Sequence, residues 1–244
     1  MKHYLVPAML AMSATAIAQE ETKPFTMDGE LGIIFTTGNS ETTSVKARVT
    51  AAQELNQWSN DYLIEGTYKK DTTEVDMIEQ SRTTAQRFFA SAQGNYKLEN
   101  PDHRLFGFAS YEDNRFSNFK YQATLAAGWS QRLWKDDVSS FEYSVGPGYA
   151  FSKTQDDESR NGAIVRGSLG YKWNISETSK FTQVLSTEIG SDNTKSRSES
   201  ALTANINGSL AMKLSVTLDH NTDVAPGVDK LDTETSVTLV YSFF

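Results

Sequence analysis

"LDTETSVTLVYSFF" (231–244) ends the chain, and its side chains alternate between polar and apolar. One face of the expected strand is apolar and carries Val237, Leu239, Tyr241 and Phe243. The opposite face is polar and carries Glu234, Ser236, Thr238 and Ser242. Chain termini of soluble domains are usually solvated, so two terminal phenylalanines indicate an apolar surrounding. The stretch predicts a β-strand with one face toward lipid.

The same period-two alternation recurs along the chain. It is clearest in YQATLAAGWSQRL (121–133), FEYSVGPGYAFS (141–152), AIVRGSLGYKW (163–173) and MKLSVTLD (212–219). Each of these segments approaches or exceeds the roughly ten residues of a transmembrane barrel strand, whereas strands of soluble sheets usually run about five or six. Length and alternation together predict strands that turn apolar side chains to lipid and polar ones to a lumen.

The turn signals divide the chain into about twelve such segments. We place them at 28–37, 42–54, 61–70, 82–97, 104–115, 119–134, 139–153, 162–175, 180–190, 197–209, 212–222 and 233–243. The facing of 104–115 is ambiguous, because Phe106 and Phe108 fall on one side and Leu105 and Tyr111 on the other. The predicted fold is an all-β, antiparallel, up-and-down transmembrane β-barrel; a soluble exported β-sandwich is the less favoured alternative.

The first residues read as an export signal. Lys2 gives a positive start, YLVPAMLAM (4–12) is an apolar stretch too short to span a bilayer, and Ala16 and Ala18 form an A-x-A cleavage pattern. A buried N-terminal helix is the alternative. We therefore expect a signal peptide over 1–18, a short periplasmic segment over 19–27 and an outer-membrane barrel over 28–244.

The connections predict two different rims. One rim is expected to carry short periplasmic turns such as KDDVS and SETS, and the other longer, mostly acidic loops. Those loops are DTTEVDMIEQS (71–81), TQDDESRN (154–161), DNTKSR (192–197) and DVAPGVDKLD (223–232). Aromatic residues beside the short turns predict an interfacial belt, formed by Trp58, Trp134, Trp173, Phe181 and Phe243.

Four blocks make the chain similar to a known family: GNSETTS (38–44), YEDNRFSNFKYQATLAAGW (111–129), GPGYAF (146–151) and DTETSVTLVYSF (232–243). They resemble the salt-induced outer-membrane protein family, a bacterial group of unknown function, from about residue 28 to 243. The resemblance implies an outer-membrane location and a barrel fold, and it brings no activity, ligand or catalytic residue.

The last strand also resembles the signal that the outer-membrane barrel-assembly machinery reads. The residues that carry this resemblance are Val237, Leu239, Tyr241 and Phe243. Such signals usually end on the lipid-facing aromatic residue, and here Phe244 is one residue extra.

Composition excludes several classes of function. The formal net charge of −8 disfavours a nucleic-acid partner, and the absence of cysteine leaves neither disulfides nor a lipid-carrying cysteine. After the signal only His103 and His220 remain as histidines, and no nucleophile motif accompanies either. His220 is the single candidate general base, and a solvated rim histidine is the favoured interpretation. We expect no enzyme activity, no cofactor and no dedicated metal site.

The polar faces of the strands predict a lumen with charges of both signs. The expected lining residues are Lys46, Arg48, Glu65, Arg87, Arg132, Glu142, Arg166, Lys172, Glu188, Lys213, Asp219 and Glu234. Opposite charges in a lumen of about twelve strands can pair and leave little water path, whereas wide porins use 16–18 strands. We therefore expect a narrow or closed barrel with a structural, stress-related role in the envelope, in contact with lipid and lipopolysaccharide. A porin-like channel for small solutes or ions is the alternative.

Overall fold

The structure is a computed structural model that describes residues 24–36, 40–75, 78–115, 119–224 and 230–244. The predicted signal peptide (1–18) and most of the predicted periplasmic segment (19–27) lie outside the described residues. Residues 25–27 of that segment already belong to the first strand, which begins at Phe25.

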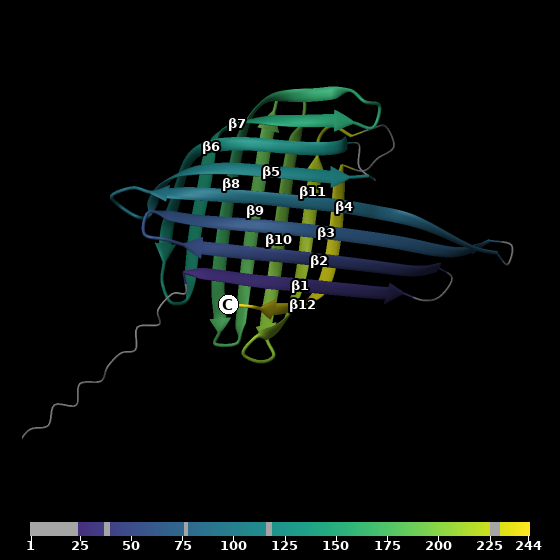
Figure 1. The fold of residues 1–244 in the computed structure, drawn as a ribbon, viewed down its shortest axis with the longest axis horizontal. Helices are drawn as coiled ribbons and strands as arrows, with labels where there is room; N and C mark the ends of the chain where they lie inside the picture. Colours follow the sequence, from purple (N-terminus) through teal and green to yellow (C-terminus); the bar gives the residue numbers. More distant parts are fainter. Residues whose placement is uncertain (1–23, 37–39, 76–77, 116–118, 225–229) are drawn as a thin grey trace, which may run out of the picture.

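Twelve strands form a closed antiparallel barrel in which each strand pairs with its neighbours in the chain. They are β1 (Phe25–Thr36), β2 (Ser40–Glu54), β3 (Trp58–Val75), β4 (Ile78–Lys97), β5 (His103–Asn114), β6 (Phe119–Lys135), β7 (Ser139–Thr154), β8 (Ser159–Ser176), β9 (Ser179–Gly190), β10 (Thr194–Asn205), β11 (Leu210–Asn221) and β12 (Leu231–Ser242). Strands β1 to β5 form one wall, and β9 to β12 cross them in the opposite wall (Figure 1). The described residues contain no helix long and apolar enough to cross a membrane. The fold confirms the predicted all-β barrel and its strand number.

The barrel closes where β1 meets β12 near the two chain ends. Four residue pairs form this seam, from Asp28 opposite Ser242 to Leu31 opposite Leu239. The backbone N–H of Phe243 adds a bond of 2.9 Å to the carbonyl of Met27. The seam is short compared with the twelve pairs that join β1 to β2. The last residues of the chain therefore decide whether the sheet has an open edge.

The strands face as their alternation predicts. On β12 the side chains of Val237, Leu239 and Tyr241 are each at least half exposed on the outer face, whereas Ser236 and Thr238 are buried inside. The ambiguous strand β5 turns Phe106 inward, with 3% exposure, and Leu105 outward, with 50%. Arg104 and Glu112, which share the parity of Phe106, are buried as well, so the lumen face of β5 mixes aromatic and charged groups.

The two rims differ less than predicted. The terminal rim, which carries both chain ends, has short turns at 55–57, 98–102, 136–138, 177–178 and 206–209. On the opposite rim, which we call the loop rim, the strand bounds leave at most four residues except at 222–230. The predicted long loop over 71–81 is wrong, because Val75 and Ile78 already lie in the β3–β4 hairpin. The β-branched residues of this segment, its threonines among them, favour a strand over a loop. The β3–β4 hairpin extends beyond the neighbouring strands (Figure 1).

Glycines allow the backbones of β6 and β7 to approach closely. A Cβ atom on Gly146 would lie 2.1 Å from the carbonyl oxygen of Ala127, and one on Gly128 would lie 2.4 Å from that of Val145. Pro147 stands between Gly146 and Gly148, where it has no N–H for the ladder. Only glycine permits this close approach of two backbones, which explains the GPG sequence.

Aromatic side chains lie on the outer face near both rims. Trp58, Trp134, Trp173 and Phe243 are 42–52% exposed near the terminal rim, where Phe181 pairs with Trp173 in register. Trp58 meets Tyr96 edge-on with ring centroids 5.2 Å apart. A second outer group near the loop rim, which the sequence analysis missed, includes Tyr111 stacked on Tyr121 and Tyr149 against Phe151. Their role as interfacial belts stays a prediction.

The facing of the wall can be tested with two arginine substitutions. Leu125 is 55% exposed on the outer face, whereas Gln93 faces the lumen opposite Asp61. Leu125→Arg should lower the free energy of unfolding by about 2–4 kcal/mol, because it places a charge in lipid near the midplane. Gln93→Arg should lower the free energy of unfolding by less, because the new guanidinium would lie in the lumen beside water and the carboxylate of Asp61. Urea unfolding in lipid vesicles measures both, and equal losses would contradict the assigned facing.

The seam can be tested by truncation. Deleting Phe243 and Phe244 removes the backbone bond to Met27 and the aromatic ring that covers Gly29, so we expect the chain to fail in assembly. Deleting Phe244 alone removes only its ring contact with Phe25 and should be mild. Membrane fractionation with protease sensitivity measures assembly. Normal assembly of the double truncation, or failure of the single one, would show that Phe243 does not complete the seam.

Candidate functional site: the lumen

Charged side chains from both walls meet in one layer across the lumen, which we call the charge layer. Its cations are Lys46, Arg48, Arg87, Lys195, Arg197 and Lys213. Its carboxylates are Glu30, Glu65, Glu112, Glu199, Asp219 and Glu234. The six charges of each sign balance, which buried ion groups require if none is to be left uncompensated.

Glu65 on β3 is the centre of the charge layer. It is 2% exposed and accepts hydrogen bonds from Arg48 Nε at 2.7 Å and Arg87 Nη1 at 2.8 Å. Lys46 Nζ lies 3.7 Å away, and Arg197 Nη2 reaches it from β10 at 3.4 Å. Four cations therefore surround one carboxylate, which offsets much of their mutual repulsion at the centre of the lumen.

Glu199 on β10 joins the opposite wall to the same cluster. Its two oxygens accept from Arg48 Nη1 at 2.6 Å and Nη2 at 2.7 Å, a bidentate pair across the lumen. Lys213 Nζ donates to Glu199 at 3.1 Å and to Glu30 at 3.0 Å. These contacts tie β1 and β2 to β10 and β11 through side chains alone.

Glu112 on β5 forms a third bridge. It accepts from Arg87 Nε at 2.7 Å and from Lys195 Nζ at 2.6 Å, so β5 is linked to β10 across the interior. Arg197 Nη1 also donates to Asp219 at 2.7 Å, and Lys46 donates to Glu234. The layer is thus one connected network.

The charge layer separates two cavities. The terminal cavity, of about 500 Å³, lies toward the terminal rim and is lined by Thr26 and Asp28 near the start of β1. The loop cavity, of about 600 Å³, lies toward the other rim and is lined by Asn221 and Lys230. Arg87, Glu112 and Lys195 line both cavities, so these side chains form the partition.

Hydroxyl groups form a row in the terminal cavity. Ser130, Ser144, Ser168 and Ser186 are opposite one another in register on β6, β7, β8 and β9, and all four line the cavity. The hydroxyls of Ser144 and Ser168 lie 2.8 Å apart. Each hydroxyl can donate and accept, so the row is a polar surface without net charge.

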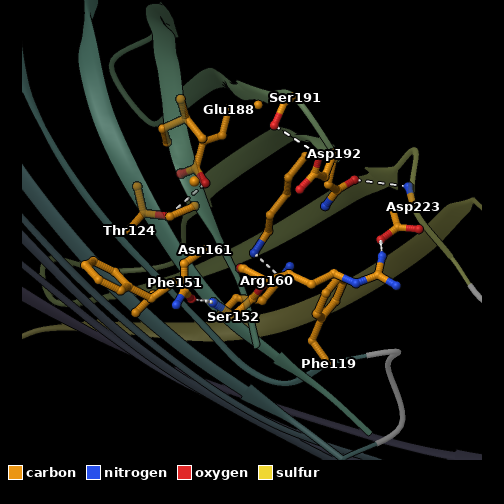
Figure 2. Close-up of a pocket in the computed structure, with 18 of the residues that line it drawn as sticks. Phe119, Thr124, Phe151, Ser152, Arg160, Asn161, Glu188, Ser191, Asp192 and Asp223 are labelled. Atoms are coloured by element: carbon orange, nitrogen blue, oxygen red, sulfur yellow. Dashed lines mark hydrogen bonds and ion pairs between the residues drawn. The ribbon is translucent and has the colours of Figure 1, made fainter. Parts of the chain in front are cut away.

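A smaller pocket of about 70 Å³ opens near the loop rim between β6 and β10 (Figure 2). Thr124 donates to Glu188 at 2.9 Å on one side, and Arg160 pairs with Asp223 on the other. The Asn161 side chain accepts from the backbone N–H of Ser152 at 3.2 Å. These contacts occupy the polar groups with one another, and the pocket is too small for more than waters.

The turn between β7 and β8 is held by two lysines. Lys120 and Lys153 each place Nζ 2.8 Å from a carboxylate oxygen of Asp157. These hydrogen bonds lower the pKa of Asp157 to about 2. Asp157 has a φ of 67°, a conformation that aspartate tolerates better than most residues. Asp157, in one of the predicted acidic loops, is thus paired with two lysines.

The predicted lumen residues fall into two groups. The structure brings Lys46, Arg48, Glu65, Arg87, Lys213, Asp219 and Glu234 together in the charge layer. The other five lie outside it, toward the terminal rim or beside the terminal cavity. They are Arg132, Glu142, Arg166, Lys172 and Glu188.

Five members of the layer were missed by the sequence analysis: Glu30, Glu112, Lys195, Arg197 and Glu199. Glu30 and Glu199 share the polar face of their strands and could have been found by parity. Glu112 lies on the strand of ambiguous facing. Lys195 was missed because β10 begins at Thr194, three residues earlier than predicted.

No group of three histidine, cysteine or carboxylate residues suited to a metal ion occurs in the part of the chain that the structure describes. His220 alternates with Asp219 on β11, and since Asp219 faces the charge layer, His220 points to the outer face. The candidate base therefore does not meet the polar groups of the lumen.

Comparisons place this barrel among known proteins. The family model described as "Protein of unknown function, DUF481" matches residues 29–243. The Escherichia coli (strain K12) "Uncharacterized protein YdiY" is 26% identical over 226 residues, which is 90% of this chain and 84% of that protein. Neither description mentions salt, so the salt-induced character of the resembled family stays a prediction.

Two solved structures share the fold. The COG4313 outer membrane channel from Pseudomonas putida F1 superposes with a TM-score of 0.51 at 8% identity, over 95% of this chain and 100% of that one. The NanC porin has a TM-score of 0.50 at 10% identity, over 88% and 98% of the two chains. At this identity the likeness concerns the fold alone, which is that of outer-membrane barrels.

The charge layer can be tested at its centre. Glu65→Gln keeps the size of the side chain and leaves four cations without their shared carboxylate, so the free energy of unfolding should fall by about 3–5 kcal/mol. Glu99→Gln, on an exposed turn residue, is the matched control and should have little effect. Urea unfolding of the barrel in lipid vesicles compares the two. Similar free energies of unfolding for both variants would show that the layer does not stabilise the barrel.

Proposed function

This chain belongs to the family described as protein of unknown function DUF481, and we propose that it is a non-enzymatic outer-membrane barrel with a closed lumen and a structural role in the envelope. The observation that carries this proposal is the charge layer. Its ion pairs join opposite walls at distances of 2.6–3.4 Å, and three of its side chains line both cavities. A pore for general solutes would need that cross-section to be open.

The energetics support closure of the lumen. The central charges of the layer are desolvated, and separating a central pair would leave a buried ion without its partner. Glu65 and Arg48 are 2% and 5% exposed, so water has little access to replace the broken contacts. We infer that the layer stays closed as long as neither a ligand nor a potential across the membrane opens it.

The placement in the membrane follows from the rims. We propose that the terminal rim faces the periplasm, because both chain ends lie there and the longest connection, 222–230, lies on the opposite rim, where barrels of this class carry their longer loops. The outer face would then contact lipid and lipopolysaccharide, and the last strand would be read by the barrel-assembly machinery. Export by the signal peptide over 1–18 is part of this proposal.

A channel for small solutes or ions is the second candidate. The observation that favours it is the thinness of the barrier, since Arg87, Glu112 and Lys195 line both cavities. The two similar structures are an outer membrane channel and a porin, which is in line with this candidate. In this case the charge layer would act as a gate.

Single-channel conductance in planar bilayers separates the candidates. We expect the wild-type barrel to show no steady conductance. The double variant Glu112→Ala with Lys195→Ala removes a balanced pair that lines both cavities and should produce steady conductance steps. The control Arg160→Ala with Asp223→Ala removes an ion pair at the loop rim and should behave like wild type.

Two results would change the interpretation. Steady steps from the wild-type barrel would overturn the closed lumen and favour the channel. A double variant that stays sealed would show that Glu112 and Lys195 are not the barrier.

A further inference from the structure

We propose that the terminal cavity is a binding site for a small monoanionic hydroxycarboxylate, held by Arg166 and the serine row. The inference rests on the closed lumen proposed above, since the charge layer would confine such a ligand to the terminal side. The cavity of about 500 Å³ is within the range of small-molecule sites.

Arg166 is the group that points to an anion. It is 6% exposed and lines the terminal cavity, yet its Nε and Nη1 atoms have no hydrogen-bond partner. Glu188 Oε1 lies 3.7 Å from Nε, too far for a hydrogen bond, and Glu188 Oε2 accepts from Thr124 instead. Other arginines of the lumen, such as Arg48 and Arg87, are bonded to carboxylates. A buried guanidinium without such bonds gains from an incoming acceptor.

The wall holds Arg166 in a fixed orientation. Its guanidinium carbon lies 3.6 Å from the ring centroid of Phe108 on β5, so it reaches past β7 and β6. Gly146 makes this possible, because it is opposite Arg166 in register and carries no side chain. A guanidinium stacked by its face keeps its edge for hydrogen bonds, and a planar carboxylate matches that edge.

The rest of the lining selects among anions. The row of Ser130, Ser144, Ser168 and Ser186 offers hydroxyls that can bond to hydroxyls of a ligand. Glu142 and Glu188 also line the cavity and would repel a second negative charge. Arg166, as a cation without a hydrogen-bonded carboxylate, the serine row and the nearby carboxylates together favour a ligand with a single carboxylate and several hydroxyls.

Calorimetric titration of the purified barrel in detergent tests the site, with D-gluconate as the probe. Sorbitol, which has similar hydroxyls and no charge, and sulfate, which is a dianion, are the comparison solutes. We expect gluconate to bind and both others to bind at least about tenfold more weakly, since a charge-assisted bond is lost or a repulsion is added.

Three variants locate the binding. Arg166→Gln should weaken gluconate binding by about tenfold to a hundredfold. Arg132→Gln removes a lumen-side arginine near Asp102 at the terminal rim and should leave the affinity unchanged. Ser144→Ala with Ser168→Ala removes two hydroxyls, and we expect the wall to keep its fold. This variant should weaken the binding of gluconate but not that of propionate, a carboxylate without hydroxyls.

Several outcomes would overturn the site. They are absence of gluconate binding up to about 10 mM, equal binding of sorbitol, or unchanged gluconate affinity in Arg166→Gln. Heat-modifiable migration on gels shows whether each variant is folded. If Arg166→Gln does not fold, the affinity of the double serine variant for gluconate decides the test. Conductance is measured separately. A barrel that shows no conductance and does not bind gluconate would therefore refute the binding site without contradicting the closed lumen.

Discussion

The structure depends on one constraint: a backbone surrounded by lipid must make all its hydrogen bonds within the protein. Twelve strands meet this constraint only because β12 returns to β1, through four residue pairs and the bond from Phe243 to Met27. Once the sheet is closed, each side chain faces either lipid or the lumen. The alternation of Val237, Thr238 and Leu239 is the local expression of that closure.

Closure creates a second demand, because the interior has to be filled. A soluble protein would fill it with apolar side chains, but here the apolar residues face lipid and the polar ones are left inside. Balanced ion pairs are one solution. Glu65 and Glu199 each bring cations from opposite walls together, which stabilises the barrel and divides the lumen at the same time.

The two halves of the lumen are not equivalent. On the loop side the carboxylates of the layer that line the cavity, Asp219 and Glu234, are bound to Arg197 and Lys46. On the terminal side a row of serines lines the wall, and Arg166 lies across it without a hydrogen-bonded carboxylate. The charged groups named on the loop side are therefore paired, whereas the guanidinium of Arg166 on the terminal side can still bind an acceptor. This is why a ligand is assigned to the terminal cavity.

The sequence by itself determined the fold, because alternation with period two reports directly on which face meets lipid. It also placed all twelve strands and seven members of the charge layer. The facing of a strand was ambiguous where both of its faces carry large apolar residues, as at Phe106 and Leu105. The prediction of a loop over 71–81 was wrong, because the charged residues there favour a loop while the β-branched residues favour a strand. Which charges meet was decided only by the tertiary structure. Arg48 and Glu199 lie far apart in the chain, and their contact depends on the curvature and register of the closed sheet, which no local pattern encodes.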